Sequence, residues 1–186
     1  MKTDTITDHV AYKVTDRIIK SQYKDNFPDE ENTLHVMRFL ISNIIPLILI
    51  LIIGIIIGNL WTIISVVLGF VLLRMLSGGY HIKNADICFL VSILLIVVLS
   101  LVPLLPEVML YIFRVVAFLI VLIYAPSNIV ENTVVRPEKH IYFKYASLIF
   151  VSISFFLDNG SFILGLFTQS LSLVNFNFVK EVNRIE

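Results

Sequence analysis

The chain has 186 residues, of which 58% are hydrophobic and 15% charged, and its mean hydropathy is +0.90. This composition excludes an ordinary soluble domain and predicts an integral protein of the lipid bilayer. The 14 basic and 14 acidic residues cancel, so no global charge indicates a nucleic-acid partner, and the single cysteine excludes an intrachain disulfide.

The N-terminal region, residues 1–38, is charged throughout and predicts a cytoplasmic or interfacial segment. Apolar residues recur in it every four positions: Ile6, Val10, Val14 and Ile18. This spacing predicts a short amphipathic helix, which could lie on the membrane face or pack on the protein's own surface. The FPDEEN stretch at 27–32 predicts a turn before the membrane domain.

The membrane domain is expected over residues 39–179. Residues 39–73 carry no charge, and one helix of that length, at about 1.5 Å per residue, would far exceed the roughly 30 Å hydrocarbon core. We therefore predict two spans that break at Gly58-Asn59, with Trp61 at interfacial depth. Four more apolar runs follow: 89–105, 108–124, about 145–157 and 161–176. The pattern predicts an all-α polytopic membrane helix bundle of about six transmembrane or re-entrant segments.

The basic residues predict the orientation of the bundle. If the six spans alternate in direction, every Lys and Arg but one falls on the side of the N-terminal region, the 74–88 and 125–144 connections and the 180–186 tail. By the positive-inside rule both termini and these connections are cytoplasmic. The exception, Arg114, is interpreted as snorkelling toward Glu107 at the outer end of its span.

The polar side chains of the last two spans are expected to make interhelical hydrogen bonds. They are Ser152, Ser154, Gln169, Ser170 and Ser172.

The stretch RMLSGGYHIKNADIC, residues 74–88, interrupts the apolar sequence and faces the cytoplasm as a surface loop or a re-entrant segment. It holds the only cysteine, Cys88, and a histidine, His81. On one continuous helix these two residues would lie about 10 Å apart along the axis, too far for the hydrogen bond of a Cys-His pair. The pair therefore requires a break in the helix between them.

The residues around His81 and Cys88 predict such a break. Gly78 and Gly79 are expected to end the preceding helix, and Asn84 or Asp86 to cap the next one. Cys88 would then fall in the first turn of the new helix, where unpaired amides and the helix dipole favour a thiolate. A lone cysteine in an apolar chain can equally be a small buried hydrophobe.

The run Arg74-x3-Gly78-Gly79-x-His81-x6-Cys88 resembles the signature of the accessory gene regulator B (AgrB) family of membrane peptidases. The later Tyr124-Ala125-Pro126 and Arg136-Pro137 stretches are similar to the Ala-Pro and basic-Pro stretches of that family. One departure is Arg136, where the family commonly has lysine, which keeps the charge but changes the hydrogen-bonding geometry.

The resemblance implies a cysteine endopeptidase of the bacterial cell membrane, a thiol protease that works in quorum sensing with its active site on the cytoplasmic side. It would cleave an AgrD-like precursor peptide, with His81 as general base and Cys88 as nucleophile. The resulting thioester would let the autoinducing peptide close into a thiolactone or lactone ring.

The other residues of the motif are given supporting roles. Arg74 would hold a substrate carboxylate or steady the loop, and Gly78 and Gly79 would permit the turn and close approach of the substrate. Asn84 or Asp86 would orient His81, unless a backbone carbonyl does so. Residues that would attract the acidic end of the precursor are Arg136, Lys139 and Lys144.

Other classes of protein compete with the peptidase. A small membrane transporter or a non-enzymatic peptide-binding membrane scaffold would also suit the composition. A metal enzyme built on His81, Cys88 and His140 is disfavoured by the scarcity of other ligands, so we expect no metal and no cofactor. We expect a homodimer, because a small bundle with two short spans leaves much apolar surface to bury.

Overall fold

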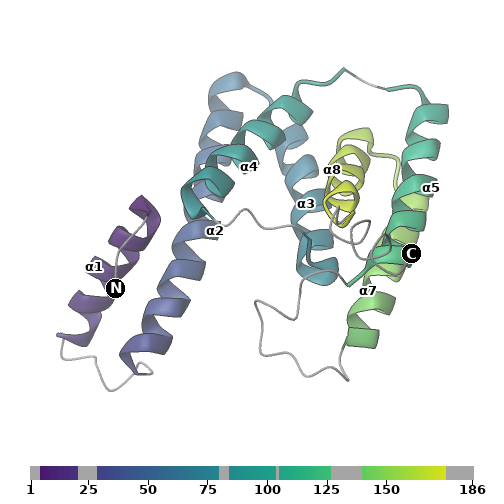
Figure 1. Ribbon diagram of the computed structural model, residues 1–186. Coiled ribbons are helices and arrows are strands. Elements are labelled where there is room, and N and C mark those ends of the chain that lie inside the picture. The colour runs from purple at the N-terminus through teal and green to yellow at the C-terminus, as the bar shows by residue number, and fades with distance from the viewer. Residues whose placement is uncertain (1–4, 21–28, 80–83, 104, 127–139, 175–186) are drawn as a thin grey trace, which may run out of the picture.

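The computed structural model describes residues 5–20, 29–79, 84–103, 105–126 and 140–174 (Figure 1). Its elements in chain order are α1 (Ile6–Ile19), α2 (Glu30–Ile57), α3 (Leu60–Ser77), α4 (Ala85–Ser100), α5 (Glu107–Tyr124), α7 (His140–Ile153), the short 3-10 helix η3 (Ser154–Phe156) and α8 (Gly160–Leu171). All elements in the described part of the chain are helical, which confirms the all-α prediction.

The apolar helices fall into two length classes. Within the described residues, α2, α3 and α5 are long and apolar enough to cross a membrane, whereas α4, the α7–η3 segment and α8 are shorter. Large apolar side chains on several helices are exposed, and Phe156 reaches 88% exposure. Such a surface suits a protein surrounded by lipid. Six crossings, and the side on which each end lies, remain predictions.

Helix α1 confirms that a helix forms where the amphipathic helix was predicted near the N-terminus. The Thr5 side chain caps it by accepting a hydrogen bond of 3.1 Å from the Asp8 amide. Its buried residues, Ala11 and Thr15, are not those of the predicted apolar stripe, and Ile6 is 76% exposed. Small side chains let α1 pack closely on α2, so the face that meets the protein differs from the stripe that the sequence indicated.

The predicted break between the first two apolar helices is confirmed. Gly58 ends α2 in the left-handed conformation, with φ of 74°, and its amide donates to the Gly54 carbonyl. Trp61 lies three residues further on and is 80% exposed, as a residue at interfacial depth would be.

The start of α2 differs from the prediction. The helix already begins at Glu30, so residues 30–32 are helical and not part of a turn. Glu30 and Glu31 lie in the first turn, where negative charge favours a helix start. The proposed boundary between residues 38 and 39 falls inside α2, and the division of the chain into domains stays a prediction.

Helix α3 lies at the centre of the bundle, with α8 between it and α5 (Figure 1). Two hydrophobic clusters flank it. The cluster shared with α2 and α4 is made of Ile50, Ile63, Val66, Val67 and Ile96. The cluster shared with α5, α7 and α8 includes Leu73, Leu110, Val121, Val151, Ile163 and Leu166. The position of α3 therefore depends on packing from both sides.

Helices α3 and α8 run in the same direction. Near their starts, the Asn159 side chain donates to the Ser65 hydroxyl at 3.1 Å, and near their ends Arg74 contacts Gln169. Among the helices of the described chain, α3 and α8 make the most extensive contact with each other. This parallel pairing brings the end of the last described helix against the polar stretch that follows α3.

Glycine makes this pairing unusually close. A Cβ atom added to Gly69 would overlap the Phe162 carbonyl oxygen, and one added to Gly165 would overlap the Val66 carbonyl oxygen. The two backbones thus touch directly, as small residues permit at helix crossings in membranes.

The interpretation of Arg114 is corrected by the structure. Its guanidinium donates a 2.8 Å hydrogen bond to the carbonyl of Leu157, not to the predicted partner Glu107. Leu157 follows η3, where the chain turns toward α8, and its carbonyl lies outside any helix of the described chain. A backbone acceptor near the guanidinium therefore takes the place of a distant carboxylate.

Most of the predicted interhelical serine bonds are also corrected. The hydroxyls of Ser154, Ser170 and Ser172 donate to carbonyls three residues earlier in their own segment, at 2.6 to 2.7 Å. Gln169 does bond across helices, as predicted. A short hydroxyl reaches its own helix backbone easily, whereas the longer amide spans the gap to a neighbour.

Candidate active site

The two adjacent glycines end α3, as predicted. Gly78 has φ of 74° and Gly79 has φ of 136°, a region that side-chain-bearing residues rarely adopt. The Gly78 amide donates to the Arg74 carbonyl at 3.0 Å and closes the last turn of the helix. The chain therefore leaves α3 sharply beside the arginine.

Asn84 caps α4, the helix that carries the cysteine. Its side-chain oxygen accepts hydrogen bonds from the amides of Asp86 at 3.0 Å and Ile87 at 3.2 Å. Of the two predicted caps, Asn84 takes this role and Asp86 does not. The Cys88 amide donates to the Asn84 carbonyl at 3.0 Å, so the half-buried Cys88 lies in the first turn of the helix, as predicted.

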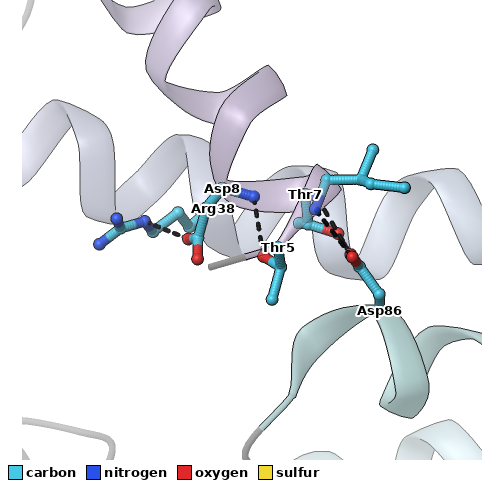
Figure 2. Close-up of polar contacts among 6 residues, drawn as sticks. Thr5, Thr7, Asp8, Arg38 and Asp86 are labelled. Carbon is cyan, nitrogen blue, oxygen red and sulfur yellow. Dashed lines mark hydrogen bonds and ion pairs between the residues drawn. The ribbon is translucent and has the colours of Figure 1, made fainter. Parts of the chain in front are cut away.

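Asp86 instead binds the start of α1, about 80 residues earlier in the chain (Figure 2). One carboxylate oxygen accepts from the Ile6 amide at 2.7 Å, and the other accepts from the Thr7 amide at 3.1 Å and the Thr7 hydroxyl at 2.7 Å. These hydrogen bonds hold the pKa of Asp86 below its usual value, and the bond from the Thr7 hydroxyl has the largest effect. The sequence did not predict this contact. Its only sign in the sequence is that the unpaired amides at the start of α1 need an acceptor.

A second contact ties α1 to the bundle. The Arg38 side chain of α2 forms a 2.7 Å ion pair with Asp8 in the first turn of α1 (Figure 2). The start of α1 is therefore held between α2 and the first turn of α4, two residues from Cys88.

We expect α1 docking to depend on the charge of Asp86. In the docked state the pKa of the Asp86 carboxyl lies below its ordinary value of 3.8. The carboxylate therefore contributes fully to docking above pH 3.8, and this contribution is lost as the pH falls through the docked pKa. Asp86→Asn should weaken docking at neutral pH and remove this acid dependence.

Hydrogen exchange of the Ile6 and Thr7 amides measures the docking. The matched control is Asp16→Asn, which removes a carboxylate of α1 that pairs only with Lys20 in the described structure. Equal protection in the wild type and in Asp86→Asn, at every pH, would show that the carboxylate does not hold α1.

Arg74 lies in the last turn of α3, and Cys88 lies in the first turn of α4, the next helix along the chain. The Arg74 guanidinium lies 5.9 Å from the Phe70 ring centroid and contacts the Gln169 side-chain oxygen at a long 3.5 Å. A positive charge in this place would attract negative charge on the sulfur.

Gln169 was not predicted as a site residue, yet it contacts the motif. Its side-chain amide donates a 2.7 Å hydrogen bond to the Gly78 carbonyl, and its side chain is fully buried. A buried glutamine near the end of an apolar helix is the sequence signal for such a role, since buried amides require partners.

The remaining predicted site residues lie outside the described residues. They are His81, Arg136 and Lys139, so the pairing of His81 with Cys88 stays a prediction. Within the described ranges, no group of three His, Cys, Asp or Glu side chains could hold a metal ion. The described part of the site holds one thiol at a helix start, one guanidinium and two glycines with positive φ.

These features define a helical membrane protein with a lone, half-buried cysteine at a helix start and a partly buried polar cluster at the end of the preceding helix. The family model described as "Accessory gene regulator B" matches residues 11–177. The chain therefore belongs to the AgrB family, as the motif indicated. A protein of Halalkalibacterium halodurans named "Putative AgrB-like protein" is 23% identical over 167 residues, which cover 84% of each chain. No solved structure matches.

Membership of this family implies a part in the accessory gene regulator system of quorum sensing. It also implies association with an AgrD precursor peptide in the membrane.

Proposed function

We propose that this protein is a membrane cysteine endopeptidase that removes the C-terminal segment of a small quorum-sensing precursor and enables its remaining part to cyclise. The observation that carries the proposal is the position of Cys88, the only cysteine of the chain, in the first turn of α4, at the far end of the connection that begins with Arg74 and the two glycines. Family membership supplies the kind of substrate, an AgrD-like peptide.

The reaction would proceed through a thioester. The Cys88 sulfur attacks the carbonyl carbon of the scissile peptide bond, and His81 takes the thiol proton and passes it to the departing amine. The C-terminal segment leaves with a new amino terminus, and the N-terminal part stays bound to the sulfur as an acyl group.

A second acyl transfer would then close the ring. An internal Cys or Ser of the precursor attacks the thioester carbonyl, loses its proton and displaces the Cys88 sulfur, which recovers a proton. A thioester retains driving force for this step, provided that water is kept away. The short, apolar α4 that carries Cys88 supports such shielding.

The supporting residues would act on substrate and geometry. Arg74 would hold negative charge near the reacting sulfur, and Gly78 and Gly79 would keep the backbone free of side chains there. Basic residues that would attract the acidic end of the precursor are Arg136, Lys139 and Lys144. We place the site on the cytoplasmic side of a multi-pass protein, in agreement with the positions of the basic residues. We infer a homodimer from the apolar surface that a small bundle leaves to bury.

Trapping the acyl-enzyme tests the proposal. A precursor whose internal Cys or Ser is replaced by alanine cannot close the ring, so the thioester should accumulate on Cys88. Intact-mass analysis should then show the protein carrying the N-terminal part of the precursor, and hydroxylamine should remove that mass. Release of the C-terminal segment with no hydroxylamine-sensitive adduct, or with an adduct elsewhere, would overturn the mechanism. Binding of the precursor without cleavage would favour a peptide-binding scaffold.

A further inference from the structure

Gln169 joins the last described helix to the motif that precedes the cysteine. Its oxygen lies 3.5 Å from an Arg74 terminal nitrogen, and its nitrogen donates to the Gly78 carbonyl at 2.7 Å. Both halves of one amide are therefore used, one on the guanidinium and one on the carbonyl of the glycine that ends α3. The side chain is 0% exposed, so the amide has no solvent contact and depends on these partners.

The neighbouring backbone depends on the same place in α8. A Cβ atom on Gly79 would lie 2.9 Å from the Gln169 nitrogen and 2.7 Å from the Ser172 hydroxyl oxygen. The turn after α3 thus passes directly over the last turn of α8. The glycine contact between α3 and α8 brings the two helices together, and the missing side chain of Gly79 leaves room for its turn to pass over α8.

We propose that Gln169 is a positioning residue of the site, which holds the Arg74 guanidinium beside Cys88 and fixes the Gly78 carbonyl at the end of α3. This inference rests on the proposed function for its catalytic meaning. Its geometric part, that Gln169 sets the position of Arg74 relative to the thiol, can be tested separately.

No common substitute keeps both contacts. Leucine has a similar volume but neither donor nor acceptor, and glutamate keeps an acceptor for Arg74 but cannot donate to Gly78 when ionised. Gln169→Leu therefore removes both contacts, whereas Gln169→Glu removes one. Ser170→Ala is the matched control, because Ser170 is the next residue, is equally buried, and donates only to Phe167 of its own helix in the described structure.

The single cysteine permits a direct measurement of the charge around the thiol. Cys88 is alkylated in the full-length protein, in nanodiscs, with iodoacetate and with iodoacetamide. The ratio of the two rates reports the local potential, because the reagents differ in charge while the thiol is the same. A guanidinium beside the sulfur favours the anionic reagent.

Gln169→Leu should lower this ratio by about twofold to fivefold, Arg74→Leu should lower it to a similar extent, and Ser170→Ala should leave it unchanged. Gln169→Glu brings a negative charge next to Arg74 and should lower the ratio as well. An unchanged ratio in Gln169→Leu overturns the inference, whatever Arg74→Leu gives.

Precursor cleavage separates the inference from the proposed function. Gln169→Leu should lower kcat by about 100-fold with little change in KM, because a misplaced group impairs the reaction more than binding. A rise in KM alone, or an equal loss of activity in Ser170→Ala, would point to a general packing role and contradict positioning. If the wild type shows the expected alkylation ratios but does not cleave the precursor, the proposed function fails while the placement of Arg74 by Gln169 stands.

Discussion

Replacing Cys88 with alanine should abolish release of the C-terminal segment of the precursor, with a loss of about 10⁴-fold or more. Without the sulfur no thioester can form, and no other cysteine in the chain can replace it. Cys88→Ser keeps the shape of the side chain but offers a far weaker nucleophile, so only traces of product are expected. Co-expression with the precursor, followed by mass spectrometry of both fragments, measures the effect.

The control for this prediction lies on the same helix. Ser100→Ala changes a small side chain at the other end of α4 whose hydroxyl donates to the Val97 carbonyl. It should retain near wild-type cleavage at equal protein level. Full cleavage by Cys88→Ala would show that the nucleophile has been wrongly assigned.

Gly165→Ala should strongly destabilise the fold. The added Cβ atom would overlap the Val66 carbonyl oxygen and lie 2.9 Å from the Val66 carbonyl carbon, so two backbones must separate. Overpacking of this kind costs about 1–3 kcal/mol, and more where backbone cannot yield. Thermal unfolding in a fixed detergent measures the loss, and cleavage should fall with it because the separation also moves Gln169 away from Arg74.

Gly160→Ala provides the comparison within α8. Its added Cβ atom would meet only the two methyl groups of Leu110, at 3.4 and 3.6 Å, which are ordinary contacts. We expect stability equal to the wild type or slightly higher, because alanine favours a helix more than glycine does. A Gly165→Ala variant as stable as Gly160→Ala would contradict the close crossing of α3 and α8.

The local features of the site could be predicted from the sequence. Gly78 and Gly79 end a helix because their backbone angles suit few other residues, and Asn84 starts one because its side chain reaches amides two and three residues ahead. The break at Gly58 follows from the same kind of rule. Each depends on neighbours within a few positions, which the sequence lists in order.

Contacts between distant residues could not be predicted in this way. Two carboxylates and an amide illustrate the difficulty: Asp86 seemed free to cap α4, Glu107 seemed the partner of Arg114, and Gln169 had no assigned neighbour. The structure gives Asp86 to α1, pairs Arg114 with a backbone carbonyl, and places Gln169 between Arg74 and Gly78. Many acceptors compete for each donor, and only the packing of helices decides which is near.

By itself the sequence determined the chemistry available to this protein: an apolar all-helical chain, one thiol at the start of a helix, and a motif of the AgrB family around it. Only the tertiary structure decided what surrounds that thiol, with α1 docked on Asp86 and α8 holding Arg74 through Gln169. The physical reason is distance along the chain. Caps and turns are set by adjacent residues, whereas the close approach of α3 and α8 arises from glycines almost 100 residues apart.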